Sequence, residues 1–364
     1  IHKRFKIILK KIMNKKIPRI LIIRCGLLGD TIDSTVIVKP LVHHYGKDLM
    51  IDWVTKPNLH DLFKFDRRIS PLFIRFTNLP LLFNFDKFKI IFNSYFKPYD
   101  AVINLEVSPK FDSFVKFMKA KIKIGRPYKF VDVQYQDEHR VDHQLRILKS
   151  HFSDMNTNNA YPYLNGSDID VKRKYNIHNR YIVICPTNSH IGKKSHRGYR
   201  AWPVNNWKIL IDKILKKTDF DIVVTGTSDE LNFIDQLDLY NKRIHNLSGR
   251  TSIPNLVNIM KYGECTIATD SGSAHVAGVS AKKVIALHGP TPYKQTGPYG
   301  NGKNLIIEAN INLHCSSCYN TDVIKMCKAN KCMINLTPDI VYKYIIKDDQ
   351  IQKHNNVVRL KKII

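Results

Sequence analysis

Two glycines and an acidic residue stand together where an apolar run near the N-terminus ends. The pattern is Gly26-x-x-Gly29-Asp30, directly after residues 20–24. Glycines permit a tight turn and let a ligand approach backbone N–H groups at the start of a helix. No Gly-Lys-Ser/Thr follows, so the segment is not a P-loop. Asp30 can also simply cap the helix that follows, because aspartate is a favoured cap residue.

Small polar residues separate a short apolar strand from a helix in residues 268–278. The sequence Ala-Thr-Asp-Ser-Gly-Ser-Ala-His-Val-Ala-Gly places hydroxyls and free backbone N–H groups at the edge of a sheet. Fixed donors at the positive end of a helix dipole suit a diphosphate. His275 lies one turn into this helix and faces either such a ligand or the protein core.

A loop after residues 181–185 gathers hydroxyl, amide and cationic donors. Its candidate residues are Thr187, Asn188, Lys193, Lys194, Arg197 and Arg200. Such groups bind phosphate oxygens, and their charge-assisted hydrogen bonds are the strongest. The alternative is an exposed basic loop without a ligand. A further loop, residues 288–300, is rich in glycine and proline and by itself indicates only a rigid connection.

Four of the seven cysteines lie close together near the C-terminal end, at Cys315, Cys318, Cys327 and Cys332. Four thiols at this spacing can hold zinc or iron in a structural site. The alternatives are paired thiols or thiols that are merely buried. An odd total number of cysteines, in a chain without a recognisable secretion signal, argues against a disulfide framework.

Alternating strands and helices position these segments. Strands are expected at residues 20–24, 49–54, 101–105 and 121–124, with a helix over 31–44, and the pattern restarts after the polar segment 153–167. There we expect strands at 181–185, 221–225, 265–269 and 283–288, with helices over 205–217, 228–237, 253–261 and 272–279. Such alternation predicts parallel sheets with right-handed crossovers, so the chain is expected to be an α/β protein with two Rossmann-like domains facing across a cleft. Residues 61–98 show too weak a periodicity to assign.

The high positive charge of the chain indicates which classes of partner it can bind. The chain has 58 Lys and Arg against 31 Asp and Glu, a net charge of +27, which favours anionic partners such as nucleotides, phosphorylated lipids or nucleic acid. A nucleic-acid-binding protein is the rival from another class. Lysine is spread along the whole sequence, however, and basic–aromatic RNA-binding motifs are missing from it.

The first 16 residues predict a basic amphipathic helix, with apolar residues at helical spacing among many lysines. Such a helix can lie on an anionic membrane surface. The alternatives are a solvated leader and a helix packed on the protein. No apolar run is long enough to cross a bilayer, and no signal peptide is recognised, so we expect a cytoplasmic protein, peripheral at the inner face of a bacterial inner membrane.

Together these segments resemble glycosyltransferase family 9, the ADP-heptose:lipopolysaccharide heptosyltransferases. The matching pieces are ILIIRCGLLGDTIDSTV, PTNS with RAWPVNNW, VVTGTSDE, NLSGRTSIPNL, and ATDSGSAHVAGV with VIALHGPTPYKQTGPYG. They occur in family order over most of residues 17–342, whereas residues 55–175 match poorly. The resemblance implies a GT-B fold, an acceptor domain followed by a donor domain, and an inverting transfer that requires no metal.

The resemblance also implies residue roles. Asp30 falls on the family's general base for the acceptor hydroxyl. The donor-binding positions fall on Thr187, Asn188, Arg200, Glu230, Asp270, Ser271, Gly272 and His275. Asn188 and Arg200 stand where the family has threonine and lysine, and the loop before Arg200 is longer than usual. Lys193, Lys194 or Arg197 can therefore take the place of Arg200, while Gly26 and Gly29 support the first turn.

We therefore expect an inverting glycosyltransferase that moves heptose or a related sugar from an ADP-sugar to a phosphorylated lipopolysaccharide inner-core acceptor, with no nucleic-acid partner. A family relative that uses another nucleotide sugar or acceptor is the alternative. The expected organisation is a basic segment (1–16), an acceptor domain (17–165), a donor domain (166–342) that includes the cysteine-rich segment (315–332), and a C-terminal tail or helix (343–364).

Overall fold

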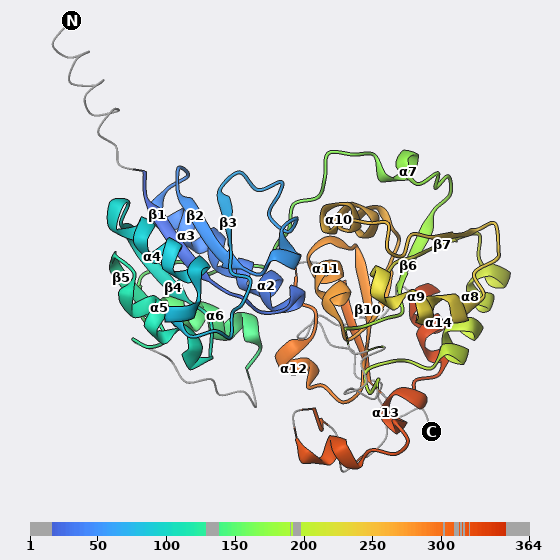
Figure 1. The fold of residues 1–364 in the computed structure, drawn as a ribbon. Helices are drawn as coiled ribbons and strands as arrows, with labels where there is room; N and C mark the ends of the chain where they lie inside the picture. Colours follow the sequence, from blue (N-terminus) through green and yellow to red (C-terminus); the bar gives the residue numbers. More distant parts are fainter. Residues whose placement is uncertain are drawn as a thin grey trace, which may run out of the picture. The chain divides into compact units, whose positions relative to one another are not determined.

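The computed structural model describes residues 17–346, except 129–137, 190, 192–197, 301–302, 309–312, 314, 316 and 320. The described chain forms two compact units (Figure 1). Of the described residues, unit 1 contains those within 17–25, 37–128 and 146–160, and unit 2 contains those within 26–36, 138–145 and 161–346. The segments 1–16 and 343–364 were assigned from sequence; the first lies outside the described residues, as do residues 347–364 of the second.

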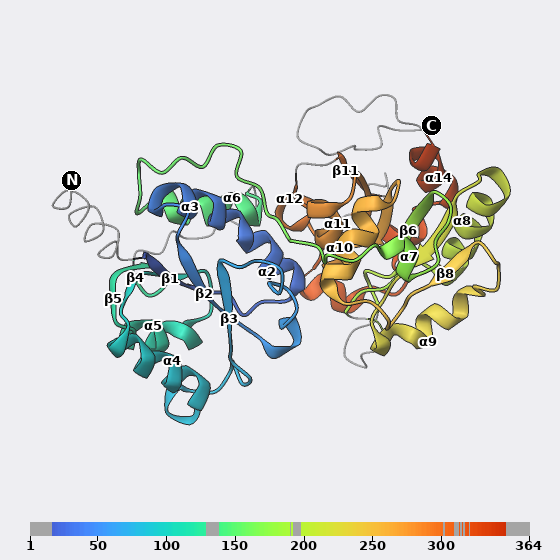
Figure 2. The same cartoon turned by 90° about the horizontal axis from the view of Figure 1, so that it is seen from above.

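Unit 1 is built on a parallel sheet of five strands in the order β3-β2-β1-β4-β5. Its strands are β1 (Arg19–Ile23), β2 (Met50–Thr55), β3 (Ile69–Phe73), β4 (Tyr99–Asn104) and β5 (Ala120–Gly125). The central strand β1 is almost wholly buried because its apolar residues meet helices on both faces of the sheet. Figure 2 shows α3 (Val38–Tyr45) and α6 (Arg140–Lys149) on one face, with α4 (Phe85–Phe96) and α5 (Asp112–Phe117) on the other.

Unit 2 has a parallel sheet of six strands in the order β11-β10-β9-β6-β7-β8. The strands are β6 (Tyr181–Cys185), β7 (Asp221–Val224), β8 (Ile244–Asn246), β9 (Thr266–Thr269), β10 (Lys283–His288) and β11 (Lys303–Glu308). Its helices are α2 (Leu28–Ser34), α7 (Val171–Lys174), α8 (Val204–Lys217), α9 (Leu231–Ile234), α10 (Ile253–Tyr262), α11 (Gly272–Ser280), α12 (Tyr293–Thr296), α13 (Lys331–Ile334) and α14 (Pro338–Ile346). In the core of unit 2, Trp202 and Trp207 pack edge to face with their ring centroids 4.8 Å apart.

The expected α/β class and the strands β1, β2, β4, β5, β6, β7, β9 and β10 are confirmed. The helix expected over residues 31–44 is wrong as a single element: α2 ends at Ser34, a 3₁₀ turn spans Thr35–Ile37, and α3 begins at Val38. The helix expected over 228–237 is likewise divided into a 3₁₀ turn, α9 and a second 3₁₀ turn.

Each unit is made of segments that are not consecutive in the sequence. The sequence predicts one domain boundary after residue 165, whereas in the structure α2 and the described residues 138–145 group with unit 2. The reason is local packing, because α2 lies against α11 and a Cβ on Gly272 would lie 3.0 Å from the side chain of Leu28. Two segments that follow unit 1 strands in sequence thus belong with the second sheet.

Candidate functional site

Asp30 lies in the first turn of α2, where the carboxylate binds two donors. Its Oδ2 accepts a hydrogen bond from the backbone N–H of Leu27 at 3.0 Å, and its Oδ1 forms an ion pair with Arg140. A Cβ on Gly26 would lie 2.5 Å from the Asp30 Cβ, which explains the glycine in this turn. Asp30 therefore stabilises the helix start, from the third helical position rather than the cap position.

One helical turn further on, Asp33 forms a buried pair with His275 of α11. The Nδ1 of His275 lies 3.0 Å from Asp33 Oδ1, and both side chains are buried. Burial alone would lower the pKa of His275, but the Asp33 carboxylate and its hydrogen bond raise that pKa above its ordinary value. Gly29 brings α2 close to this ring, since a Cβ there would lie 2.5 Å from His275 Cδ2.

Asp270, directly after β9, is the centre of a second buried cluster. Its Oδ2 accepts a hydrogen bond from the Thr291 hydroxyl at 2.5 Å and lies 3.3 Å from Arg200 Nε. Burial opposes ionisation, yet His288, Arg200 and the Thr291 hydroxyl hold the pKa of Asp270 below its ordinary value. The Arg200 guanidinium also lies over the Tyr319 ring, 4.1 Å from its centroid. Asp270 is thus a fixed anion that orients a cation.

Thr187 and Glu230 are joined at the ends of β6 and β7. The Thr187 hydroxyl donates to Glu230 Oε2 at 2.7 Å, and the same oxygen accepts from the backbone N–H of Thr227 at 2.8 Å. Gly226 makes room for this contact, because a Cβ there would lie 3.2 Å from Glu230 Oε2. Asn188, the next residue after Thr187, is buried.

The start of α11 offers donors without a protein partner. Ser271 is the residue before the helix, its side chain makes no capping bond, and its buried Oγ has no hydrogen-bond partner among the described residues. Gly272 follows as the first helical residue. A hydroxyl and backbone N–H groups at a helix start can bind a phosphate oxygen.

Electrostatic coupling links these groups within unit 2. The charge of Arg140, which pairs with Asp30, lowers the pKa of His275, while Asp270 raises it. His275 in turn contributes to the lowered pKa of Asp270. The structure therefore brings Asp30, Asp270 and His275 into one electrostatic network that ends at Arg200.

Three groups of this network were not among the sequence candidates. Asp33 follows Asp30 at i+3, a helical spacing that could have indicated it. Thr291 belongs to the proline-rich loop after β10, which by itself indicated only rigidity. Arg140 lies in a poorly matching region, and its neighbour His139 lies 2.9 Å from the Gly297 carbonyl oxygen. Three sequence candidates, Lys193, Lys194 and Arg197, lie outside the described residues.

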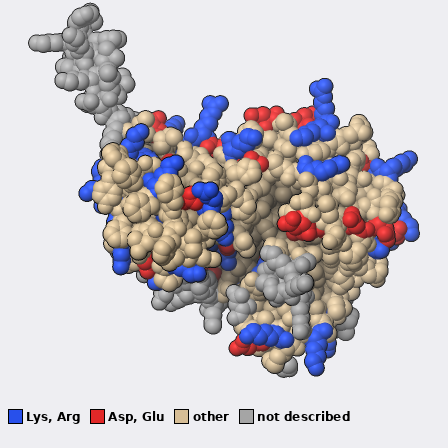
Figure 3. Space-filling view, viewed as in Figure 1, with Lys and Arg blue, Asp and Glu red and all other residues tan. Residues whose placement is uncertain are grey.

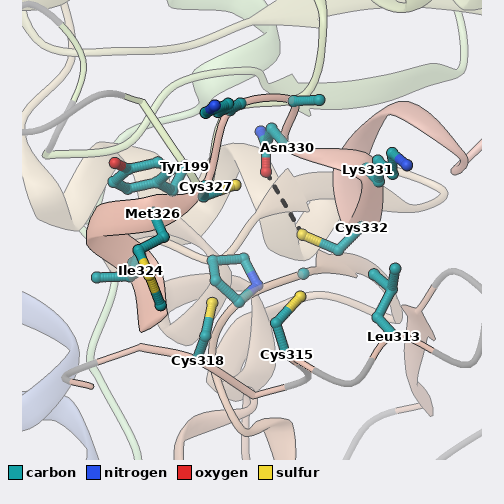
Figure 4. A pocket seen from close by; sticks show the side chains of 14 residues that line it. Tyr199, Leu313, Cys315, Cys318, Ile324, Met326, Cys327, Asn330, Lys331 and Cys332 are labelled. Carbon is teal, nitrogen blue, oxygen red and sulfur yellow. Dashed lines mark hydrogen bonds between the residues drawn. The ribbon is translucent and has the colours of Figure 1, made fainter. Parts of the chain in front are cut away.

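The four clustered cysteines line one cavity of about 260 Å³ (Figure 4). Cys315 and Cys318 come from the segment after β11, Cys327 ends a 3₁₀ turn, and Cys332 lies in α13. Burial and the three neighbouring thiols raise the pKa of Cys332 to about 12, and its Sγ lies 3.4 Å from Asn330 Oδ1. Among the described residues, no three His, Cys, Asp or Glu side chains are arranged to hold a metal ion.

Two Rossmann-like parallel sheets, one of them with a glycine turn and a helix-start donor site, are the architecture of the GT-B fold, which solved family 9 structures share. The sequence profile of "Glycosyltransferase family 9 (heptosyltransferase)" matches residues 96–325. The chain belongs to this family, which confirms the resemblance seen in the sequence.

Known proteins show the same relationship. A lipooligosaccharide heptosyltransferase 2 of Campylobacter jejuni is 32% identical over 109 residues, 29% of this chain, and the match spans only 33% of that protein's length. A family 9 glycosyltransferase of Veillonella parvula has a similar fold, with a TM-score of 0.75 at 18% identity over 90% of this chain and 95% of that chain. The Escherichia coli ADP-heptose LPS heptosyltransferase II gives a TM-score of 0.71 at 18% identity, over 89% and 96% of the two chains.

Proposed function

We propose that this protein transfers heptose, or a related sugar, from an ADP-sugar to a phosphorylated lipopolysaccharide inner-core acceptor. Family membership supports sugar transfer, and the name of the E. coli relative supports an ADP-heptose donor. The observation that carries the proposal is the packing of α2 on α11, where a Cβ on Gly29 would touch His275. It places the Asp30 carboxylate and the Ser271 helix start on two contacting helices of one unit.

The proposed reaction is an inverting displacement. Asp30 accepts the proton of the acceptor hydroxyl while that oxygen attacks the anomeric carbon, and the bond from this carbon to the diphosphate oxygen breaks. Negative charge then grows on the leaving ADP. The Ser271 hydroxyl, the N–H groups at the start of α11 and the Arg200 guanidinium stabilise this charge. We propose that Glu230 binds the ribose and that Asp270 holds Arg200 in place.

Arg140 sets the condition under which Asp30 can act. The ion pair orients the carboxylate, but the guanidinium occupies an oxygen that would otherwise accept the proton. We propose that the acceptor, whose phosphate groups attract the same guanidinium, draws Arg140 away from Asp30 on binding. The protein would thus activate its base only when the acceptor is present.

Nucleotide competition tests the donor assignment. We expect ADP to raise the melting temperature of the full chain more than UDP or GDP at equal concentration, because the ligand with the lower dissociation constant stabilises the folded state more. Asp30→Asn should retain the ADP shift and lose sugar transfer by at least about 100-fold, the usual scale for a general base. Equal protection by UDP would favour the alternative, a relative with another donor. An Asp30→Asn variant with normal turnover would exclude the proposed base.

The acceptor and the location in the cell follow from the same proposal. A phosphorylated glycolipid is anionic, and the net charge of +27 favours such a partner. Among the described residues, no helix combines the length and apolar character needed to cross a membrane. We propose that the protein acts in the cytoplasm at the inner face of the inner membrane, and that nucleic acid is not its partner.

We further propose that the four clustered thiols hold a structural zinc or iron ion, and that the transfer itself needs none. The donor chemistry fits, because four soft sulfur ligands line one cavity. The described residues do not form a ligand shell, so ligation would require the thiols to move closer together.

Metal analysis tests this site. We expect about one zinc or iron per purified chain, and we expect Cys318→Ser to lose the metal and melt at lower temperature, because metal binding contributes folding energy. The control is Cys265→Ala, a buried thiol outside the cluster, which should keep the metal. A wild-type chain free of zinc and iron would show that the thiols serve packing alone.

A further inference from the structure

The outer side of α4 carries a row of aromatic side chains. Exposed fractions are 78% for Phe85, 53% for Phe88, 57% for Phe92 and 72% for Phe96. The rings of Phe92 and Phe96 contact each other with centroids 4.9 Å apart. The opposite side of the helix, with Lys87, Ile90, Ile91 and Ser94, is buried against the sheet. The helix is therefore apolar on both sides, although only one side meets the core of unit 1.

The loop before α4 extends this surface. Four more large apolar side chains are exposed there: Phe76, Leu79, Leu82 and Phe83. Together with the four phenylalanines of α4 they form what we call the aromatic ridge. Contiguous exposed apolar surface of this kind marks an interaction site, whereas single exposed apolar residues are ordinary.

Buried polar contacts hold the ridge in this exposed form. The ammonium group of Lys87 is buried and donates to the carbonyl oxygens of Thr77 and Leu79, both at 3.1 Å. Asn84 caps α4 by accepting from the Lys87 backbone N–H at 3.0 Å, and its amide donates to the Phe76 carbonyl oxygen at 2.6 Å. Burying a lysine is costly unless it is hydrogen-bonded. The loop is thus fixed by specific bonds with its apolar side chains outward.

The exposed charges around the ridge are mostly positive. Lys89 and Lys97 are exposed on α4 and at its end, and Lys116 and Lys119 are exposed on the adjacent α5 side. The acidic residue within the ridge, Asp86, is paired with Arg75. On the face drawn in Figure 3, the unit that carries α4 and α5 shows a broad uncharged surface with Lys and Arg at its margins.

We propose that the aromatic ridge docks this protein onto an anionic lipid bilayer. Phenylalanine and leucine side chains enter the boundary between headgroups and acyl chains, while lysines bind the anionic headgroups. The ridge is a helix edge with a protruding loop, a shape that inserts into a soft surface. A second copy of the chain, related by two-fold symmetry, would set lysine against lysine. The inference rests on this surface and goes beyond the proposed reaction.

Vesicle co-sedimentation of the full chain tests the ridge. Mixed phosphatidylcholine–phosphatidylglycerol vesicles, without any sugar acceptor, should bind the wild type more strongly than pure phosphatidylcholine vesicles do, and added salt should weaken binding. Phe85→Ser combined with Phe92→Ser should reduce the partition coefficient by at least about tenfold, because two large apolar groups no longer enter the bilayer. The matched control, Tyr240→Ser with Tyr262→Ser, removes two exposed rings elsewhere and should bind normally.

A second variant, with altered charges, tests the ridge independently in case the double phenylalanine variant fails to fold. Lys89→Glu with Lys97→Glu should lower binding to anionic vesicles and leave the weak binding to phosphatidylcholine unchanged. Wild-type binding by both ridge variants would overturn the proposal and assign the membrane contact to another segment, such as residues 1–16. Self-association that the phenylalanine variant abolishes, without vesicle binding, would instead identify a second copy as the occupant. The nucleotide-induced melting shift measures the donor site separately, so failure of one proposal is distinguishable from failure of the other.

Discussion

At the scale of single residues, the pair of Asp33 and His275 is the most consequential contact of the site. Asp33 lies on α2, one turn beyond Asp30, and it holds the His275 ring through Nδ1. The other ring nitrogen, Nε2, lies near Gly29. The raised pKa of His275 favours the protonated ring beside Asp33, so the pair is held together by charge as well as by the hydrogen bond. The sequence correctly predicts that His275 lies in a helix after β9. It could not show whether the side chain faces a ligand or the core, because its partner, Asp33, is 242 residues away.

The pH dependence of stability tests this pair. Because the pKa of His275 is raised in the folded state, the pair stabilises the fold fully below the unfolded pKa of about 6.5, and this contribution disappears as pH rises through the raised value. We expect Asp33→Asn to lower the free energy of unfolding by about 1–3 kcal/mol at acidic pH, and by less above the folded pKa. Denaturant unfolding across a pH series measures both curves.

The control for this prediction is Asp61→Asn, which removes the partner of His60 in an exposed pair at 3.4 Å. Such surface pairs contribute about 0–1 kcal/mol, so that variant should follow the wild-type curve closely. If the curves of wild type and Asp33→Asn ran parallel at all pH values, His275 would not titrate with Asp33 as its partner.

At the scale of elements, the contact between α2 and α11 determines the site. Glycine in a helix usually lowers stability relative to alanine by about 1 kcal/mol, so its presence at position 29 needs a packing reason. The reason is the His275 ring, which lies 2.5 Å from where a Cβ would stand. The two helices thus approach as closely as a residue without a side chain allows.

Gly29→Ala should therefore destabilise the protein despite its better helix propensity. We expect a loss of about 1–3 kcal/mol, the usual cost of overpacking, and weaker protection by ADP as α11 shifts. Thermal and denaturant unfolding measure the stability, and the ADP-induced shift in melting temperature measures how well the variant still binds the nucleotide. Asn93→Ala, an exposed position in α4, is the matched control and should be neutral or slightly stabilising. A stabilised Gly29→Ala variant would contradict this account of the contact.

At the scale of the whole molecule, the sequence predicted the core strands because apolar runs bounded by turn residues are local signals. It did not predict β3 or α4, and in α4 the reason is that phenylalanines on the outer side, opposite buried isoleucines on the inner side, hide the helical period. It also missed Arg140, whose role depends on a tertiary contact with Asp30 rather than on any neighbouring residue. Local sequence patterns thus predicted most strands and the motifs, whereas the residues that contact the motif side chains could be identified only from the structure.

The chain passes between the two units at residues 25/26, 36/37, 145/146 and 160/161, and once more between the described residues 128 and 138. No single cut can therefore separate a complete unit 2. A fragment cloned from Tyr161 onward would keep the six-stranded sheet yet lack Asp30, Asp33 and Arg140. Exchange of unit 2 between relatives would accordingly require grafting residues 26–36 and the described residues 138–145 together with the C-terminal part.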